Sequence, residues 1–314
     1  MKPYAFGIDL GGTTAKLGFF TTDGTLLEKW EVPTNKTNDG ANILPNLAAA
    51  VRAKMAEREI GFDALAGVGI GVPGAVRENG YVPVCANLNG FGDCNVSEAL
   101  SSLLDGIFVK TANDANIAAL GEYWMGGAKE YQSVVLTTLG TGVGGGVIVN
   151  GKIMTGGHGA GGEIGHITVN RSERAICGCG KKGCLEQYSS ATGVVRGMKR
   201  ILAEFSDPSM LRDKDFAAKD VFDAARQGDA LAQLSIDEMS AHLGHALSTI
   251  AETIDPEIFL LGGGVSKAGD ILTEAVTKHF KKCVFSACRE TPIKIATLGN
   301  DAGIYGAVKL ILPE

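Results

Sequence analysis

The sequence predicts an α/β protein made of two similar halves with a ligand cleft between them. Short apolar segments typical of strands alternate along the chain with segments of helical spacing, which is typical of the α/β class. The tripeptide Asn-Asp-Ala occurs at 113–115 and again at 300–302, each time between a predicted strand and a predicted helix. Many of the 44 glycines gather in five clusters, which indicates a large ligand held by main chain at several places.

The first half is predicted to contain five strands and two helices. The segment 42–60 is expected to be a helix because its apolar residues recur at helical spacing, and Gly61 ends it. A second helix is expected over 113–124. Short apolar runs predict strands over 5–10, 16–20, 26–32, 65–72 and 107–110.

The second half repeats this pattern with additional helices. Helices are expected over 266–280 and 302–310, and 193–244 is expected to be mainly helical. That last stretch carries no obvious chemistry, so structural helices and a subunit contact are its expected roles. Strands are predicted over 133–139, 146–149, 257–261 and 293–297.

Composition argues against several classes of function. The net charge of −6 argues against a broad electrostatic grip on nucleic acid or on an anionic membrane. No segment approaches the roughly 18 continuous apolar residues that would span a bilayer, and no export signal is visible at the N-terminus. We therefore expect a cytoplasmic protein, in which the seven cysteines indicate metal or thiol chemistry before disulfides.

The segment Asp9–Lys16 reads Asp-Leu-Gly-Gly-Thr-Thr-Ala-Lys and suits the phosphate chain of a nucleotide. Two glycines in a turn between strands expose backbone N–H groups, and the threonines and the lysine add hydroxyls and a positive charge. Asp9 can hold a hydrated Mg²⁺, a cation that prefers oxygen ligands. The alternative is a tight hairpin with a surface lysine. The candidate phosphate contacts are Gly11, Gly12, Thr13, Thr14 and Lys16.

A second glycine-rich turn follows at 139–146. Gly140, Gly142 and Gly145 match the dinucleotide fingerprint, but Val147–Val149 continues as a strand, whereas that fingerprint must open a helix. A Walker A loop is excluded as well, since Ile153 stands where Ser or Thr is needed. A second phosphate hairpin remains. The candidate nucleotide contacts in this half are Gly140, Thr141, Gly142, Gly262, Gly263 and Gly264.

Asp114 is the candidate catalytic base. It is placed where a strand ends and a helix begins, and a helix N-terminus favours an ionised carboxylate. Such a carboxylate can accept the proton of a sugar hydroxyl that attacks the γ-phosphate of ATP. The alternative is helix capping, which we expect for Asp301 in the second copy of the tripeptide. Local sequence alone does not separate the two aspartates.

A group of polar side chains predicts a sugar site beside a metal site. Glu163 and His166 are three residues apart and would share one face of a helical turn, and Glu186 follows shortly after. Together with the amides of Asn87 and Asn113, these groups can hydrogen-bond several hydroxyls of a sugar. Each could equally be solvated surface.

Three cysteines crowd into the segment Cys177–Cys184. With glycines between them, Cys177, Cys179 and Cys184 can wrap one Zn²⁺, and His166 supplies a fourth ligand. Four protein ligands make a closed, structural site. The alternative is a redox pair or small buried cysteines.

These residues together resemble the ROK family (repressors, open reading frames, kinases), and within it the bacterial glucokinases. The resemblance covers nearly the whole chain, and its segments occur in the same order. They are Asp9–Lys16, Gly71–Gly74, Asn87, Asn113–Asp114, Leu139–Gly146, Gly161–His166, Cys177–Glu186 and Leu261–Gly264. The run Asn87–Phe91 departs slightly from the family's usual Asn-Leu-x-x-Trp.

The resemblance implies a fold, a reaction and a set of site residues. The fold is the actin-like ATPase fold, with one domain over 1–113 plus about 298–314 and a larger one over 114–297. The reaction is MgATP-dependent phosphorylation of the 6-hydroxyl of a hexose, with glucose expected and Asp114, not Asp301, as the base. Structural Zn²⁺ on His166 and the three cysteines and a homodimer are implied as well. The implied sugar contacts are Gly74, Asn87, Asn113, Asp114, Glu163, His166 and Glu186.

Two alternatives stay open at this stage. A kinase for N-acetylmannosamine, N-acetylglucosamine, mannose or fructose would use the same residues, because these sugars share most hydroxyls. A sugar-sensing DNA-binding regulator of the same family would carry an added N-terminal winged-helix domain. The phosphate loop starts here at Asp9, and with the acidic charge this disfavours the regulator.

Overall fold

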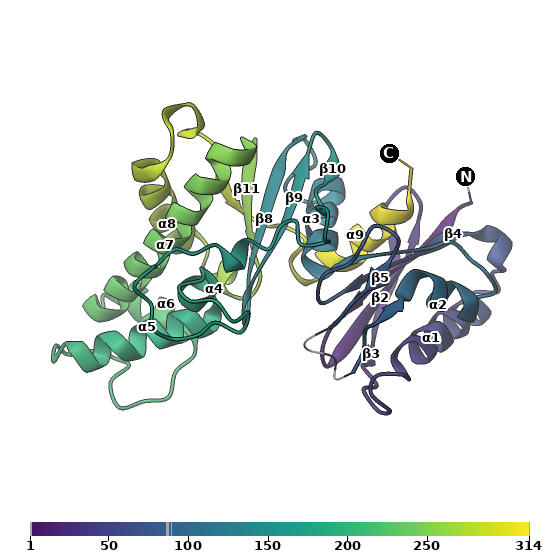
Figure 1. The fold of residues 1–314 in the computed structure, drawn as a ribbon, viewed down its shortest axis with the longest axis horizontal. Coiled ribbons are helices and arrows are strands. Elements are labelled where there is room, and N and C mark those ends of the chain that lie inside the picture. Colours follow the sequence, from purple (N-terminus) through teal and green to yellow (C-terminus); the bar gives the residue numbers. More distant parts are fainter. Residues whose placement is uncertain (1, 86–87, 89, 314) are drawn as a thin grey trace.

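The computed structural model describes residues 2–85, 88 and 90–313, and its framework is a pair of five-stranded sheets (Figure 1). The strand order is β3-β2-β1-β4-β7 in the first sheet and β10-β9-β8-β11-β12 in the second. Each sheet combines three antiparallel strands with two parallel ones, so the second repeats the topology of the first. The predicted α/β class and duplicated halves are confirmed.

The first half follows the predicted order closely. Helix α1 covers Ile43–Glu57 and begins where the helical spacing predicts. Helix α2 covers Val96–Leu103 and is capped by the Asn95 side chain, which accepts a hydrogen bond from the Glu98 N–H. The strands are β1 (Tyr4–Leu10), β2 (Thr14–Thr21), β3 (Leu26–Pro33), β4 (Leu65–Val72), β5 (Tyr81–Val82), β6 (Cys94–Asn95) and β7 (Val109–Asn113), and a 3₁₀ turn covers Phe62–Ala64.

The second half adds a helical layer to its sheet. Its strands are β8 (Val134–Leu139), β9 (Val143–Val149), β10 (Lys152–Ile153), β11 (Ile258–Gly262) and β12 (Ile293–Ile295). Its helices are α4 (Glu186–Ser189), α5 (Ala191–Glu204), α6 (Ala218–Arg226), α7 (Ala230–Ile254) and α8 (Asp270–Cys283), with 3₁₀ turns at Ile164–His166, Val265–Ala268, Ser286–Cys288 and Gly299–Asp301. No helix among the described residues combines the length and the apolar character needed to traverse a bilayer.

One predicted helix is wrong in its extent. The expected helix over 266–280 is split at Gly269, where a 3₁₀ turn over Val265–Ala268 ends and α8 begins. Gly269 has φ of +66°, a left-handed conformation that interrupts a helix and that glycine adopts without strain.

Two helices join the halves. Helix α3 (Asp114–Met125) follows β7, and α9 (Ala302–Ile311) follows β12; the two pack against each other in the middle of the molecule (Figure 1). Their approach is close because glycines stand at the crossing: a Cβ on Gly306 would lie 1.6 Å from the Ile117 carbonyl oxygen. A Cβ on Gly121 would lie 2.1 Å from the Ala302 carbonyl oxygen.

Each sheet has its own core. Phe6, Ile8 and Ile70 belong to the first core, which α1 and α2 cover, and Phe259 and Phe280 belong to the second, which α5 to α8 cover. The chain passes from one sheet to the other after β7 and returns after β12. The domain limits at 113 and about 298 stay a prediction.

Candidate active site

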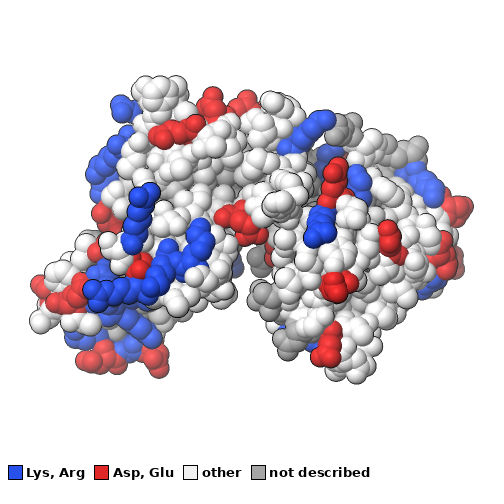
Figure 2. All heavy atoms as spheres, viewed as in Figure 1, with Lys and Arg blue, Asp and Glu red and all other residues white. Residues whose placement is uncertain are grey.

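Strand β1, the second glycine hairpin and the N-terminus of α3 meet at one pocket of about 560 Å³. The pocket lies between the halves, where Figure 2 shows an indentation of the surface. Ten residues singled out in the sequence line it, although they are far apart along the chain. They are Asp9, Gly74, Asn113, Asp114, Gly140, Gly142, Glu163, His166, Glu186 and Gly263.

Two carboxylates stand close enough in this pocket to influence each other. Asp9 is the penultimate residue of β1, and burial raises its pKa to about 6, with a further increase from the Asp114 charge and an opposing effect of Lys16. Asp114 opens α3 with its side chain open to the pocket. The protein around it displaces bulk water, and this desolvation together with the Glu163 charge raises the pKa of Asp114, against the Ala115 N–H that lowers it.

Asn113 caps the helix that Asp114 opens. Its side-chain oxygen accepts hydrogen bonds from the N–H groups of Ala115 (2.9 Å) and Asn116 (3.1 Å), which caps α3. Its amide nitrogen donates to the Gly74 carbonyl at 3.0 Å. Asn113 therefore carries the cap in this copy of the tripeptide and leaves the neighbouring carboxylate available to the pocket.

The first hairpin is held as a tight turn in which the Gly11 N–H donates to the Thr14 carbonyl at 3.1 Å. Asp9 is paired with Lys16 across the two strands. The Lys16 ammonium is directed elsewhere, to the Asn300 carbonyl at 2.9 Å. Among the predicted nucleotide contacts, the structure does not bring Gly11, Gly12, Thr13, Thr14, Lys16, Thr141, Gly262 or Gly264 into the lining of the pocket.

Glu186 braces the second hairpin. The Val143 N–H donates to its Oε2 at 3.1 Å, and a Cβ on Gly142 would lie 2.1 Å from that same oxygen. Glycine is therefore required at 142 for the carboxylate to reach the turn. On the other side, Gly263 has φ of +80° and packs against Leu139 at the base of the hairpin.

The predicted sharing of a face by Glu163 and His166 is confirmed. Glu163 precedes the 3₁₀ turn Ile164–His166, of which His166 is the last residue, and the His166 Nε2 lies 4.0 Å from a Glu163 carboxylate oxygen. The other ring nitrogen, Nδ1, faces the sulfur of Cys177 at 3.8 Å. His166 thus connects the pocket to the cysteine cluster through its two nitrogens.

The ligand atoms of His166, Cys177, Cys179 and Cys184 all lie within 4.8 Å of one another. The Cys179 and Cys184 sulfurs are 3.6 Å apart. A tetrahedral zinc with Zn–S bonds of about 2.3 Å has ligand–ligand edges of ~3.8 Å. The side chains could therefore hold one tetrahedral metal ion with little rearrangement.

Two predicted residues need separate comment. Asn87 lies outside the described residues. The expectation that Asp301 caps its helix is wrong: the Asp301 side chain makes no capping bond with α9 and pairs with the Lys29 ammonium at 2.5 Å. The carboxylate binds a cation on β3, which sequence spacing does not reveal.

Sequence reasoning also missed two residues that matter for the site. Thr138 lines the pocket from β8. Glu122 is fully buried in α3 and accepts hydrogen bonds from the backbone N–H groups of Gly127 (2.8 Å), Thr297 (3.1 Å) and Leu298 (2.7 Å). It thereby ties α3 to the segment in which the chain returns toward the first sheet. A glutamate within an apolar helical face was the available signal.

Comparison with known proteins supports the resemblance. The chain is 41% identical over 311 residues to a glucokinase of Halalkalibacterium halodurans, covering 97% of this chain and 94% of that protein. It is 30% identical to an N-acetyl-D-glucosamine kinase of Haemophilus influenzae, covering 98% and 99% of the two chains. The crystal structure of a ROK family glucokinase from Streptomyces griseus, in complex with glucose and AMPPNP, superposes with a TM-score of 0.79 at 32% identity over 98% of each chain. The ROK family model matches residues 5–314, and the chain belongs to the ROK family.

Proposed function

We propose that this chain is an ATP-dependent hexose kinase that converts glucose to glucose 6-phosphate. The observation that carries the proposal is the meeting of the Asp114 carboxylate with Asp9 and the second glycine hairpin in one pocket. Full-length similarity to glucokinases supports the choice of glucose.

Asp114 acts as the general base in this proposal. The 6-hydroxyl oxygen forms a bond to the γ-phosphorus, the bond from that phosphorus to the leaving ADP oxygen breaks, and the hydroxyl proton passes to the Asp114 carboxylate. The pKa of Asp114 is raised by desolvation and by the Glu163 charge, which makes the carboxylate a stronger base. The Asn113 cap orients the helix turn that carries it.

ATP would lie along the two hairpins, with backbone N–H groups facing its phosphates. Asp9 and Asp114 are two carboxylates whose pKa values are raised in the same pocket, and such a pair fits a divalent cation. Mg²⁺ held by Asp9 would neutralise charge on the transferring phosphoryl group. The Gly262–Gly264 turn is proposed to seat the nucleoside.

The sugar would be oriented by groups on the other wall of the pocket. Glu163, His166 and Glu186 line it from two segments, and the Asn113 amide and Gly74 lie beside Asp114. Hydrogen bonds to several hydroxyls would hold the 6-hydroxyl next to the base, which is the positioning that phosphoryl transfer needs. Asn87 completes this set as a prediction from sequence.

The cysteine cluster is proposed to bind a structural Zn²⁺. Three thiolates and one imidazole make a closed four-ligand site that leaves no position for substrate. The ligand set spans Ile164–His166 and the loop before α4, so the metal would fix Glu163 and Glu186 relative to each other. The metal's contribution is therefore to the shape of the sugar pocket.

Two further features belong to the proposal. The first is the pair of domains, 1–113 with about 298–314 and 114–297, which the separate cores support. The second is a homodimer, as family members commonly form. Light scattering on the purified chain tests it: a mass of twice 32.6 kDa is expected, and a monomer mass would remove it.

The test of the function is ADP release from MgATP with glucose, mannose, fructose, N-acetylglucosamine and N-acetylmannosamine. We expect glucose to give the highest kcat/KM by roughly tenfold, which is ~1.4 kcal/mol of discrimination. The rival is an N-acetylhexosamine kinase, which the similarity to such enzymes favours. A higher kcat/KM for an N-acetylated sugar would select that rival, and release that no sugar stimulates would remove the kinase proposal.

A further inference from the structure

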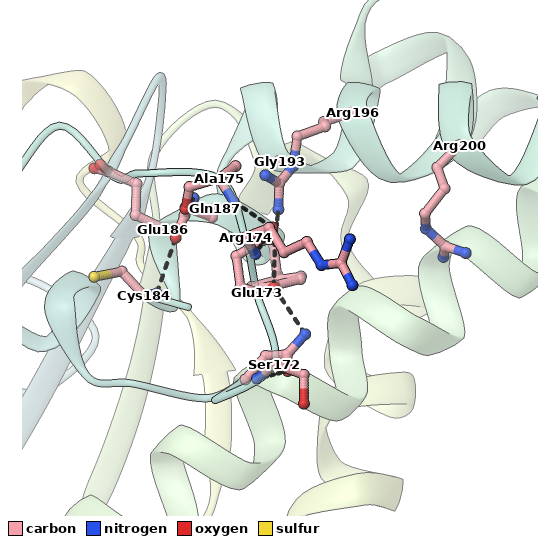
Figure 3. A network of polar contacts seen from close by, with 12 residues as sticks. Ser172, Glu173, Arg174, Ala175, Cys184, Glu186, Gln187, Gly193, Arg196 and Arg200 are labelled. Carbon is pink, nitrogen blue, oxygen red and sulfur yellow. Dashed lines mark hydrogen bonds and ion pairs between the residues drawn. The ribbon is translucent and has the colours of Figure 1, made fainter. Parts of the chain in front are cut away.

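A second hollow of about 610 Å³ lies behind the active pocket, between the 170–174 segment, α5 and α7 (Figure 3). Three arginines line it against two glutamates, although the whole chain is acidic, with a net charge of −6. Figure 2 shows a band of Lys and Arg side chains on this half of the molecule. The arginines are Arg174, Arg196 and Arg200.

Helix α4 separates this hollow from the active pocket. Glu186, its first residue, lines the active pocket, whereas the next two residues, Gln187 and Tyr188, line the second hollow. Gln187 is fixed in place, because its Oε1 accepts from the Cys184 N–H at 3.1 Å and its Nε2 donates to the Ala175 carbonyl at 3.1 Å. The two cavities are distinct and share one short helix as a wall.

Both glutamates of the hollow are already satisfied. Glu173 accepts from the Tyr188 hydroxyl at 2.6 Å and from the Arg196 guanidinium at 2.8 Å, and two backbone N–H groups also donate to it. These hydrogen bonds lower the pKa of Glu173 to about 2, and the bond from Tyr188 has the largest effect. Glu238 pairs with Arg200. The acids therefore hold two of the arginines in position.

Arg174 is the exception. Its side chain is exposed, and within residues 2–85, 88 and 90–313 no hydrogen bond or ion pair engages its guanidinium. Figure 3 shows this group directed away from the Glu173 carboxylate, toward the space in front of Arg200. A guanidinium held over a cavity with two further arginines attracts an anion, and its planar fork matches phosphate oxygens.

Ser235 gives an independent indication of a missing ligand. This α7 residue lines the hollow and is only 3% exposed, yet its hydroxyl has no hydrogen-bond partner within the described part of the chain. A buried hydroxyl without a partner costs free energy, so such groups are normally bonded to protein, water or ligand. The Ser235 hydroxyl beside Gly197 is thus available to hydrogen-bond a ligand in the hollow.

We propose that this hollow binds a phosphate monoester, with Arg174 as its main charge contact and Ser235 as a hydrogen-bonding partner. The volume exceeds what a phosphate alone needs and lies in the range of small-molecule pockets. The amides of Asn170 and Gln187 add groups that can bond sugar hydroxyls. The ligand class therefore includes a hexose phosphate, and the product of the proposed reaction is one; that part rests on the proposed function.

The test is calorimetric titration of the full chain with glucose 6-phosphate and, separately, with inorganic phosphate. Saturating glucose, Mg²⁺ and a non-hydrolysable ATP analogue occupy the active pocket, and chloride holds the ionic strength constant. We expect one further equivalent to bind, and Arg174→Gln to weaken that binding by ~10-fold or more, because a charge-assisted bond is lost. Arg171→Gln, at a neighbouring arginine outside the hollow, is the matched control and should bind like the unaltered chain.

The binding data can overturn the proposal or identify the ligand. Absence of saturable binding, or equal binding by Arg174→Gln, overturns the proposal. Ser235→Ala should weaken binding by ~3- to 10-fold without destabilising the free chain, since the hydroxyl it removes has no partner. A lower Kd for glucose 6-phosphate identifies the sugar phosphate as ligand, and equal constants identify free phosphate. The phosphate titration does not depend on sugar-kinase activity. Repeated without glucose, it still tests phosphate binding in the hollow even if the ADP-release assay refutes the proposed function.

Discussion

The two copies of Asn-Asp-Ala occupy matching places in the two halves and have different surroundings. In the first copy, Asn113 caps α3 and Asp114 is open to the pocket, where desolvation raises its pKa. In the second copy, the Asn300 carbonyl accepts the Lys16 ammonium and Asp301 pairs with Lys29. The same tripeptide therefore yields a candidate base in one half and a surface ion pair in the other.

The neighbouring strands explain this difference. At the end of β1, Asp9 pairs in register with Lys16, and at the matching place in the second sheet Thr138 pairs with Gly144. At this position the first sheet thus contributes a carboxylate to the cleft, and the second contributes a threonine and glycine main chain. The two halves have the same sheet topology, and the residues at the strand ends determine which half carries the candidate base.

The largest expected effect comes from exchanging the two aspartates for asparagine. Asp114→Asn removes the proton acceptor and should lower kcat by ~10²- to 10⁴-fold, the usual contribution of a positioned general base. Asp301→Asn removes only a partly exposed ion pair and should leave kcat near that of the unaltered chain. Steady-state ADP release with glucose measures both.

Circular dichroism and a glucose titration should show that Asp114→Asn keeps its fold and still binds sugar. Equal loss of kcat in the two variants would break the comparison, because it would mean that the second copy also takes part in turnover.

The sequence predicted the frame better than the direction of individual side chains. The alternation of apolar runs located β4 at 65–72 without error, since a buried strand needs a continuous apolar segment. The sequence did not predict the bonds that Lys16 and Asp301 make, because their partners, Asn300 and Lys29, are far away in sequence. Contacts of that kind arise only when the sheet and α9 are assembled.

For the pocket, too, the sequence predicted some residues and missed others. Glycine and acidic motifs located most of its lining, because tight turns and charged groups leave local signals. Thr138 and Glu122 were missed, since a threonine in a strand and a glutamate in a helix are common. Their importance follows from the buried hydrogen bonds and the pocket wall, which a local signal such as a glutamate within an apolar helical face does not specify.

The second prediction concerns the proposed metal loop, which lies in the second half. Cys179→Ser should lower the melting temperature by roughly 10 °C, because loss of a structural metal ligand costs several kcal/mol. Cys179 is exposed, so the change removes a ligand without opening a cavity. Cys283→Ser, at another exposed cysteine, is the control and should melt like the unaltered chain.

Differential scanning calorimetry with and without a chelator measures this effect. The unaltered chain treated with chelator should approach the Cys179→Ser value. An unchanged melting temperature in metal-free protein would contradict a structural zinc.

The third prediction concerns the helices that the two tripeptides open. Gly306→Ala would place a methyl group 1.6 Å from the Ile117 carbonyl oxygen, so α9 must move away from α3. We expect a loss of about 2–3 kcal/mol in the free energy of unfolding, as for overpacked cores. Urea unfolding measures it.

Gly197→Ala is the matched control for Gly306→Ala, because its Cβ would meet only the Ser235 hydroxyl at 3.8 Å. It should gain ~0.5–1 kcal/mol from the removal of a helical glycine. A loss of stability as large as that of Gly306→Ala would show that the crossing of α3 and α9 is no more sensitive to an added methyl group than an ordinary helix position.

The smallest expected effect tests the charge that distinguishes the first half. The pKa of Asp9 is about 6 in the folded chain against an ordinary value of 3.8, because burial and the Asp114 charge disfavour ionisation. Below about pH 3.8 the Asp9 carboxyl is protonated in both folded and unfolded states, and the folded state is not destabilised by a buried charge. As the pH rises through about 6 the folded carboxylate ionises, and the stability that the protonated group gave is lost.

Asp9→Asn should therefore be more stable than the unaltered chain at pH 7.5 by about 1–2 kcal/mol, after allowance for partial exposure, while losing MgATP-dependent turnover. The difference should shrink toward zero as the pH falls to about 4. Urea unfolding without nucleotide at both pH values measures it, with Asp301→Asn as the control that shows no such gain. A stability difference independent of pH would mean that packing, and not the charge on Asp9, separates the two halves at this position.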